Sequence, residues 1–165
     1  MKRSRRYRAR VYSTNVSHHV NAPRAAVYRA LLDPAAIAKW RVPAGMTGTV
    51  HEFEAREGGR FRVSLTYDAP GSAGKSTART DTYHGHFVAV VENEQVVEQL
   101  EFETADAALH GTMTMTTTLT DAEGGGTDVT VKHDGIPDSV PAADNEAGTR
   151  MALVNLADLV ESAQH

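Results

Sequence analysis

Residues 20–40 read VNAPRAAVYRALLDPAAIAKW, and this stretch contains two helix starts in close succession. Pro23 suits the first turn of a helix, because the N–H group that it lacks is not needed there and its φ angle is preset. Apolar side chains then recur at helical spacing. Asp33 can cap the free N–H groups of a second helix, which Pro34 opens and which ends near Trp40. We therefore predict two short helices that follow one another directly after a strand.

The sequence on both sides of this stretch is typical of β-strands. Residues 8–20 are β-branched, aromatic and polar without helical spacing. Residues 60–67 alternate, with Phe61, Val63 and Leu65 on one face and polar side chains on the other. Turn signals separate the other predicted strands, which are residues 47–56, 82–91, 95–104, 111–120 and 127–133. Six or seven strands in meander order indicate an antiparallel sheet.

A last helix is predicted after a turn at Gly135–Pro137, with Pro141 near its start. Its apolar stripe consists of Ala152, Leu153, Leu156, Leu159, Val160 and Ala163. No other long helix is predicted, so we expect this one to cover the sheet. The sequence thus indicates an α+β protein in which residues 11–165 form a single domain and residues 1–10 form a basic tail.

Composition narrows the functional classes. The chain has 165 residues, a formal net charge of −4 and no cysteine. The charge argues against a nucleic-acid binder that works through overall charge. Without cysteine there is no disulfide framework, zinc–thiolate site, iron–sulfur cluster or thiol nucleophile. Because no apolar run could span a bilayer, we expect a cytoplasmic protein, monomeric or weakly dimeric, with no nucleic-acid partner, no membrane partner and no cofactor.

Four local motifs, in order, resemble those of the START-like (SRPBCC) superfamily. They are Val20–Tyr28, with its Ala-Pro helix entry, Leu32–Trp40, with its Asp-Pro…Trp spacing, Glu57–Phe61, with its Gly-Gly-x-Phe hairpin, and Tyr83–Phe87, a strand entrance. The resemblance is to the branch named for activators of the heat-shock protein 90 ATPase, and it extends from about Ser17 to the C-terminus. It implies a helix-grip fold, in which a curved antiparallel sheet of six or seven strands wraps around the long C-terminal helix.

Two positions depart from the pattern of that family. Members commonly have a second tryptophan after the first, where this chain has Arg41, and a Gly-Trp pair in the last helix, where it has Gly148-Thr149. Losing two large rings is expected to enlarge or reshape the interior. The predicted loop at 68–81 is also longer than is usual in the family.

The resemblance implies a cavity between the sheet and the last helix that binds a small, largely apolar molecule, with lipids among the candidates. The residues expected to line it are Trp40, Arg41, His51, Phe53, Phe61, Val63, Leu65, Tyr83, Phe87, Leu100, Phe102, Met113, Met115, Leu153 and Leu156. The alternative, that the apolar residues among them simply fill the core, stays open at this point.

Three of these lining residues are polar. His51 shares strand parity with Phe53, so it is expected to point inward with that ring. Tyr83 is expected to point inward with Phe87 for the same reason. An inward Arg41 could hold a carboxylate or phosphate through bidentate hydrogen bonds, and His51 could act as an acid or base. The alternative for each is a rim residue that faces water.

His84 and His86 share one face of a strand, which is a geometry that can chelate zinc or copper. A stable site needs three or four ligands, and the sequence dictates no third one, although His110 and Glu101 are candidates. No metal site is predicted.

Two further features receive structural rather than functional interpretations. Residues 69–76 nearly match a phosphate-binding P-loop, but no helical pattern follows them, so we predict a plain loop. Glu98, Glu101 and Glu103 lie on or near one strand, and we expect such acids on a wet outer face.

Three functions remain for this sequence. The first is a ligand-binding domain. The second, suggested by the name of the branch, is a co-chaperone that contacts a heat-shock protein 90-type ATPase. The third is a polyketide cyclase-like enzyme that uses His51, Tyr83 and Arg41, and it is less favoured because no convergent catalytic pair is evident.

Overall fold

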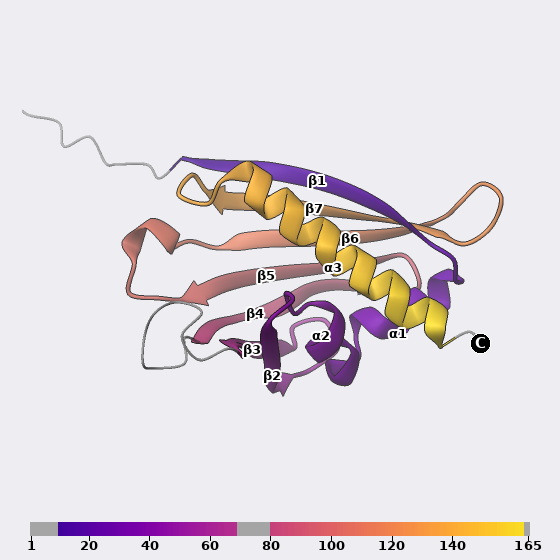
Figure 1. The fold of residues 1–165 in the computed structure, drawn as a ribbon, viewed down its shortest axis with the longest axis horizontal. Helices are drawn as coiled ribbons and strands as arrows, with labels where there is room; N and C mark the ends of the chain where they lie inside the picture. Colours follow the sequence, from indigo (N-terminus) through magenta and orange to yellow (C-terminus); the bar gives the residue numbers. More distant parts are fainter. Residues whose placement is uncertain (1–9, 69–79, 164–165) are drawn as a thin grey trace, which may run out of the picture.

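The computed structural model describes residues 10–68 and 80–163 (Figure 1). Its elements are β1 (Val11–Val20), α1 (Arg24–Leu31), α2 (Pro34–Trp40), β2 (Met46–Phe53), β3 (Arg60–Tyr67), β4 (Thr80–Val91), β5 (Gln95–Glu103), the short 3-10 helix η1 (Ala107–Leu109), β6 (Met113–Asp121), β7 (Thr127–Pro137) and α3 (Ala142–Ser162). The seven strands, the two short helices and the long last helix are all confirmed. Residues 1–9 of the basic tail and the P-loop-like segment lie outside the described residues.

The strands form one antiparallel sheet in the order β1-β7-β6-β5-β4-β3-β2. Consecutive strands are neighbours from β2 to β7, and β1 pairs with β7, so the first and last strands lie side by side. In Figure 1, α3 crosses one face of this sheet diagonally, and α1 and α2 lie beside its C-terminal half. The sheet face under α3 is called the inner face below.

The helix starts follow the predicted chemistry closely. Asp33 caps α2 by accepting a hydrogen bond from the backbone N–H of Ala35 at 3.0 Å, and Pro34 is the first residue of that helix. Pro23 is the N-cap of α1 with extended φ and ψ angles, so it stands just before the first turn rather than in it. Pro141 holds the same position at the start of α3.

The predicted turn at Gly135–Pro137 is wrong, because β7 continues through these residues. Ile136 pairs with Tyr12 and Pro137 pairs with Val11. The register shifts between Tyr12 and Thr14, and Gly135 has a φ angle of +74°. A bulge at a positive-φ glycine absorbs the extra residue, so the strand bends without ending.

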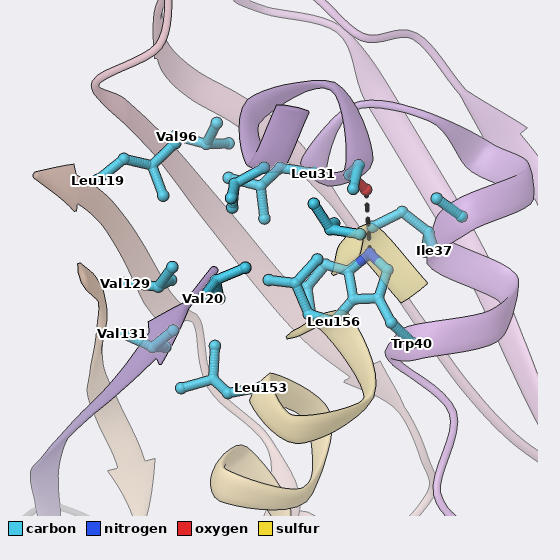
Figure 2. Close-up of a cluster of buried hydrophobic side chains, with 14 of the residues drawn as sticks. Val20, Leu31, Ile37, Trp40, Val96, Leu119, Val129, Val131, Leu153 and Leu156 are labelled. Carbon is cyan, nitrogen blue, oxygen red and sulfur yellow. Dashed lines mark hydrogen bonds between the residues drawn. The ribbon is translucent and has the colours of Figure 1, made fainter. Parts of the chain in front are cut away.

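The core lies between the inner face and the three helices (Figure 2). Leu153 and Leu156 of α3 are 1% and 0% exposed and face the valines of β1 and β7. The Trp40 ring packs beside them, and its Nε1–H donates to the carbonyl oxygen of Ala30 at 3.0 Å. This bond holds the end of α2 against α1 and thereby fixes the position of Arg41, which is the next residue. Within the described part of the chain, no helix is both long and apolar enough to cross a membrane.

Candidate functional site

A row of mostly polar side chains crosses the inner face of the sheet. The register pairs Thr14 of β1 with His133 of β7, His133 with Met115 of β6, and Met115 with Glu98 of β5. Directly opposed residues of antiparallel strands point to the same face, so these four side chains lie next to one another under α3. Thr14, Glu98 and His133 are all buried. The row therefore brings three polar groups into a mostly apolar core.

Arg41 reaches this row from the end of α2 and forms a buried ion pair with Glu98. Its Nη1 donates to Oε1 of Glu98 at 2.7 Å, and the two side chains are 11% and 6% exposed. Its Nη2 donates to the sulfur of Met115 at 3.2 Å. The guanidinium carbon lies 5.6 Å from the ring centroid of Trp40 and 5.8 Å from that of Tyr83. Arg41 thus points inward, as expected, although it already has a carboxylate partner.

The prediction that Glu98 lies on a wet outer face is wrong. Along β5, Val96, Glu98 and Leu100 are all buried, while Glu101 and Glu103 are not. The alternation of the strand places Glu98 on the inner face with its two apolar neighbours. Sequence reasoning missed this residue because it grouped the three glutamates by type, whereas their strand parity separates them.

The surroundings of the pair determine which groups carry charge. Burial acts to lower the pKa of Arg41, but the charge of Glu98 and the hydrogen bond that it accepts outweigh this effect and raise that pKa. Burial raises the pKa of Tyr83, Glu98 raises it further, and Arg41 acts in the opposite direction. Tyr83 is therefore neutral at pH 7, and the interior polar cluster formed by Arg41, Tyr83, Glu98 and His133 contains one balanced ion pair.

His133 is the residue that sequence reasoning did not consider. Burial, reinforced by the charge of Arg41 and opposed by Asp134, lowers its pKa to about 4, so the ring is neutral at pH 7. Along β7, His133 shares strand parity with Val129 and Val131, and all three side chains are buried. Strand parity could therefore have identified His133 from the sequence.

Hydrogen bonds with Asn145 of α3 determine which nitrogen of the neutral His133 ring carries the proton. Thr14 Oγ1 donates to Oδ1 of Asn145 at 2.6 Å, so the amide nitrogen of Asn145 is on the other side, 3.2 Å from Nδ1 of His133. That nitrogen can only donate, hence Nδ1 accepts and the ring proton is on Nε2. Nε2 is buried and has no hydrogen-bond partner among the described residues. The cluster therefore contains an N–H donor without an acceptor.

A small hollow lies beside Arg41, at the edge of the cluster. It lies in the seam between the end of α2 and the first half of α3, and its volume is about 40 Å³. Trp40, Arg41, Gly148 and Met151 are among its lining residues. A Cβ atom added at Gly148 would meet nothing within 4 Å, so this position leaves open space. The departure from the family pattern at Gly148-Thr149 falls at this opening.

The apolar residues that were expected to line a cavity are packed together. The buried ones are Trp40, Phe61, Val63, Phe87, Leu100, Met113, Leu153 and Leu156, and the partly buried ones are Phe53, Leu65, Phe102 and Met115. Tyr83 joins them and points inward, as predicted, with its ring centroid 6.2 Å from that of Phe61. All of them belong to the core, and their contact with a ligand stays a prediction.

The prediction that His51 points inward with Phe53 is wrong. The β2–β3 register shifts between Val50 and Glu52, which makes His51 the extra residue of a bulge and breaks its parity with Phe53. The His51 ring is exposed and lies on the outer face, where its Nε2 is 2.7 Å from Oγ of Ser64. His51 and Tyr83 therefore lie on opposite faces of the sheet and cannot act together on one substrate.

His84 and His86 also lie on the outer face, in a depression of about 830 Å³. His84 Nδ1 is 3.1 Å from Glu103, which also accepts two hydrogen bonds from Arg62, at 2.8 and 3.0 Å. Bonding to Arg62 lowers the pKa of the Glu103 carboxyl. Over residues 10–68 and 80–163, no group of three or more His, Asp or Glu side chains is placed to hold a metal ion. His84 is thus hydrogen-bonded to Glu103 beside the surface ion pair of Arg62 and Glu103.

The antiparallel sheet, the two helices after its first strand and the long helix across its inner face define a START-like (SRPBCC) protein with the helix-grip fold. Residues 21–161 match the family model described as "Activator of Hsp90 ATPase homolog 1-like protein", and the chain belongs to this family. The resemblance in the four sequence motifs is thereby confirmed. Contact with a chaperone stays a prediction.

Solved structures of bacterial proteins have the same fold. A protein from Chromobacterium violaceum is 29% identical, with a TM-score of 0.79 over 91% of this chain and 98% of that chain. A protein from Rhodobacter sphaeroides is 20% identical, with a TM-score of 0.76 over 93% and 98% of the two chains. A protein from Rhizobium leguminosarum is also 20% identical, with a TM-score of 0.71 over 93% and 96%. No curated protein matches the chain by sequence.

Proposed function

We propose that this protein binds a small, largely apolar molecule between the inner face of the sheet and α3, with the polar end of that molecule at the interior polar cluster. The observation that carries the proposal is the buried ion pair of Arg41 and Glu98, with the unpartnered N–H of His133 in the same row. A buried ion pair is often no more stabilising than apolar side chains of similar volume, and a buried donor without an acceptor is destabilising. A few polar groups among apolar walls are typical of ligand pockets.

The route to the cluster runs through the seam between α2 and α3. The hollow of about 40 Å³ beside Arg41 has room for water but not for an organic ligand, so binding requires the seam to widen. Gly148 presents no side chain there, and the Met115 thioether behind Arg41 can change rotamer easily. All the buried residues of α3 lie from Leu153 onward, so residues 146–152 can move without opening the core.

A fluorescent apolar probe, N-phenyl-1-naphthylamine, tests this proposal with two matched variants. We expect saturable binding by the unmodified protein and a loss of at least about tenfold in affinity in Gly148→Trp, because the indole fills the seam. Ala147→Trp is the control, since Ala147 is exposed and does not line the hollow, and we expect it to bind like the unmodified protein. Absence of saturable binding, or equal losses in both variants, would contradict the proposal.

A further inference from the structure

We infer that the ligand of this site carries an uncharged hydrogen-bond acceptor, such as the carbonyl oxygen of a ketone, ester or amide, which accepts the Nε2–H of His133. The inference rests on the proposed function and specifies the class of molecule that the site takes. It depends on three observations: the direction of the hydrogen bonds around His133, the charge balance of the cluster, and the path from the seam to the histidine.

The hydrogen bonds around His133 require an acceptor in the ligand. Asn145 is oriented by Thr14, whose hydroxyl donates to its Oδ1, and this leaves only a donor facing Nδ1 of His133. The proton of the neutral ring is therefore on Nε2, where no described residue accepts it. A ligand hydroxyl or amine that needed to donate at this position would meet a second donor, whereas an oxygen lone pair would complete the bond.

The charge balance of the cluster favours a neutral ligand. The guanidinium of Arg41 is already matched by Glu98 at 2.7 Å, and both side chains are buried. A ligand carboxylate would bring a second negative charge next to Glu98 in a medium of low dielectric constant, with no additional cation to offset it. A ligand cation would likewise bring a second positive charge next to Arg41, with no additional anion to offset it. An uncharged acceptor avoids both conflicts.

Arg41 and Met115 lie between the seam and His133. Arg41 lines the hollow at the seam and bonds to the sulfur of Met115 at 3.2 Å. Met115 is the direct cross-strand neighbour of His133. A ligand group that displaces the Met115 side chain therefore arrives beside the His133 ring, while the apolar remainder of the ligand stays against Trp40 and α3.

Three probes that share the fluorene ring system test the ligand class: 9-fluorenone, which has a carbonyl acceptor, fluorene, which has none, and fluorene-9-carboxylate, which is an anion. Isothermal titration calorimetry on the full chain should give an affinity for fluorenone at least about tenfold above those for the other two. His133→Leu removes the donor at similar volume, and we expect it to bind fluorenone and fluorene equally.

The infrared carbonyl band of fluorenone, recorded on variants that still bind this probe, reports the hydrogen bond itself. Hydrogen bonding should shift this band to lower wavenumber in the unmodified protein, and the shift should be absent in His133→Leu and His133→Phe. Binding of all three probes without preference, or a band shift that survives in both variants, would overturn this inference and leave the proposed function standing. Failure of every probe to bind would overturn both.

Discussion

Arg41 and Glu98 depend on each other more than surface charges do, because each is buried beside the other. Arg41→Met leaves the Glu98 carboxylate buried without its partner, and we expect the free energy of unfolding to fall by about 3–5 kcal/mol. The double variant Arg41→Met, Glu98→Leu removes both charges, and we expect it to regain most of that loss. Urea denaturation of the two single variants and the double variant measures this coupling.

The exposed pair of Arg56 and Glu54, with an N–O distance of 2.9 Å, is the matched control. Because water screens it, Arg56→Met should leave the urea midpoint unchanged. Additive losses in the Arg41–Glu98 cycle would mean that the two side chains do not act as a pair in solution.

His133 makes the stability of the fold depend on pH in a defined window. Its pKa falls from 6.5 for the free side chain to about 4 in the folded protein, so the unfolded chain binds the proton more readily between these values. Stability therefore rises with pH through this window and is lost as the pH falls from 6.5 towards 4, by about 3 kcal/mol in total.

His133→Leu is the reference for this prediction, because carboxylates also titrate in part of the window. Chemical denaturation at several pH values should show a difference in slope between the unmodified protein and the variant from pH 6.5 to pH 4. Parallel stability curves would show that His133 is not buried in its neutral form.

Strand parity accounts for both the successes and the failures of sequence reasoning at the level of residues. Tyr83 could be placed inward because no irregularity separates it from Phe87. His51 could not be placed correctly, since nothing in the sequence marks the bulge after Val50. His133 was within reach of the same parity rule, but its lack of a hydrogen-bond partner depends on Asn145, which is 12 residues away on another element.

The β4 strand shows why one element requires a glycine at its centre. Gly85 lies between β3 and β5, and a Cβ atom there would stand 1.9 Å from the carbonyl oxygen of Gln99 and 2.8 Å from Cζ of Phe61. The motif Tyr83–Phe87 therefore carries its glycine for a packing reason: the Phe61 ring occupies the place of the missing side chain. Element order could be predicted from the sequence, but this close approach could not, because it depends on three strands at once.

The same substitution should have opposite effects in two elements. Gly85→Ala forces backbone atoms apart, and we expect it to destabilise the fold by about 3 kcal/mol. Gly148→Ala adds a methyl group in open space on α3, and we expect it to stabilise by up to about 1 kcal/mol, because alanine is the better helix former. Thermal denaturation followed by circular dichroism measures both. Equal effects of the two variants would contradict the contacts described for Gly85.

At the scale of the whole molecule, α3 has two halves with different anchoring. Its buried residues, Leu153, Leu156, Ala157 and Val160, all lie in the second half, where the helix packs on the sheet and on α1. The first half carries the exposed Met151 and is linked to the sheet through the Asn145 hydrogen bonds to Thr14 and His133. Segments with few buried apolar contacts open locally at lower free energy than the global fold.

Hydrogen exchange measured by mass spectrometry should therefore divide α3 in two. We expect amides in residues 146–152 to exchange much faster than those in residues 153–160, and saturation with 9-fluorenone to slow the first group and leave the second unchanged. Leu156→Ala is the informative comparison: it weakens the core under the second half, so it should speed exchange in residues 153–160 through global unfolding. Uniform protection along the helix of the free protein would mean that α3 moves as one body, and a ligand would then have to enter by a route other than the seam beside Arg41.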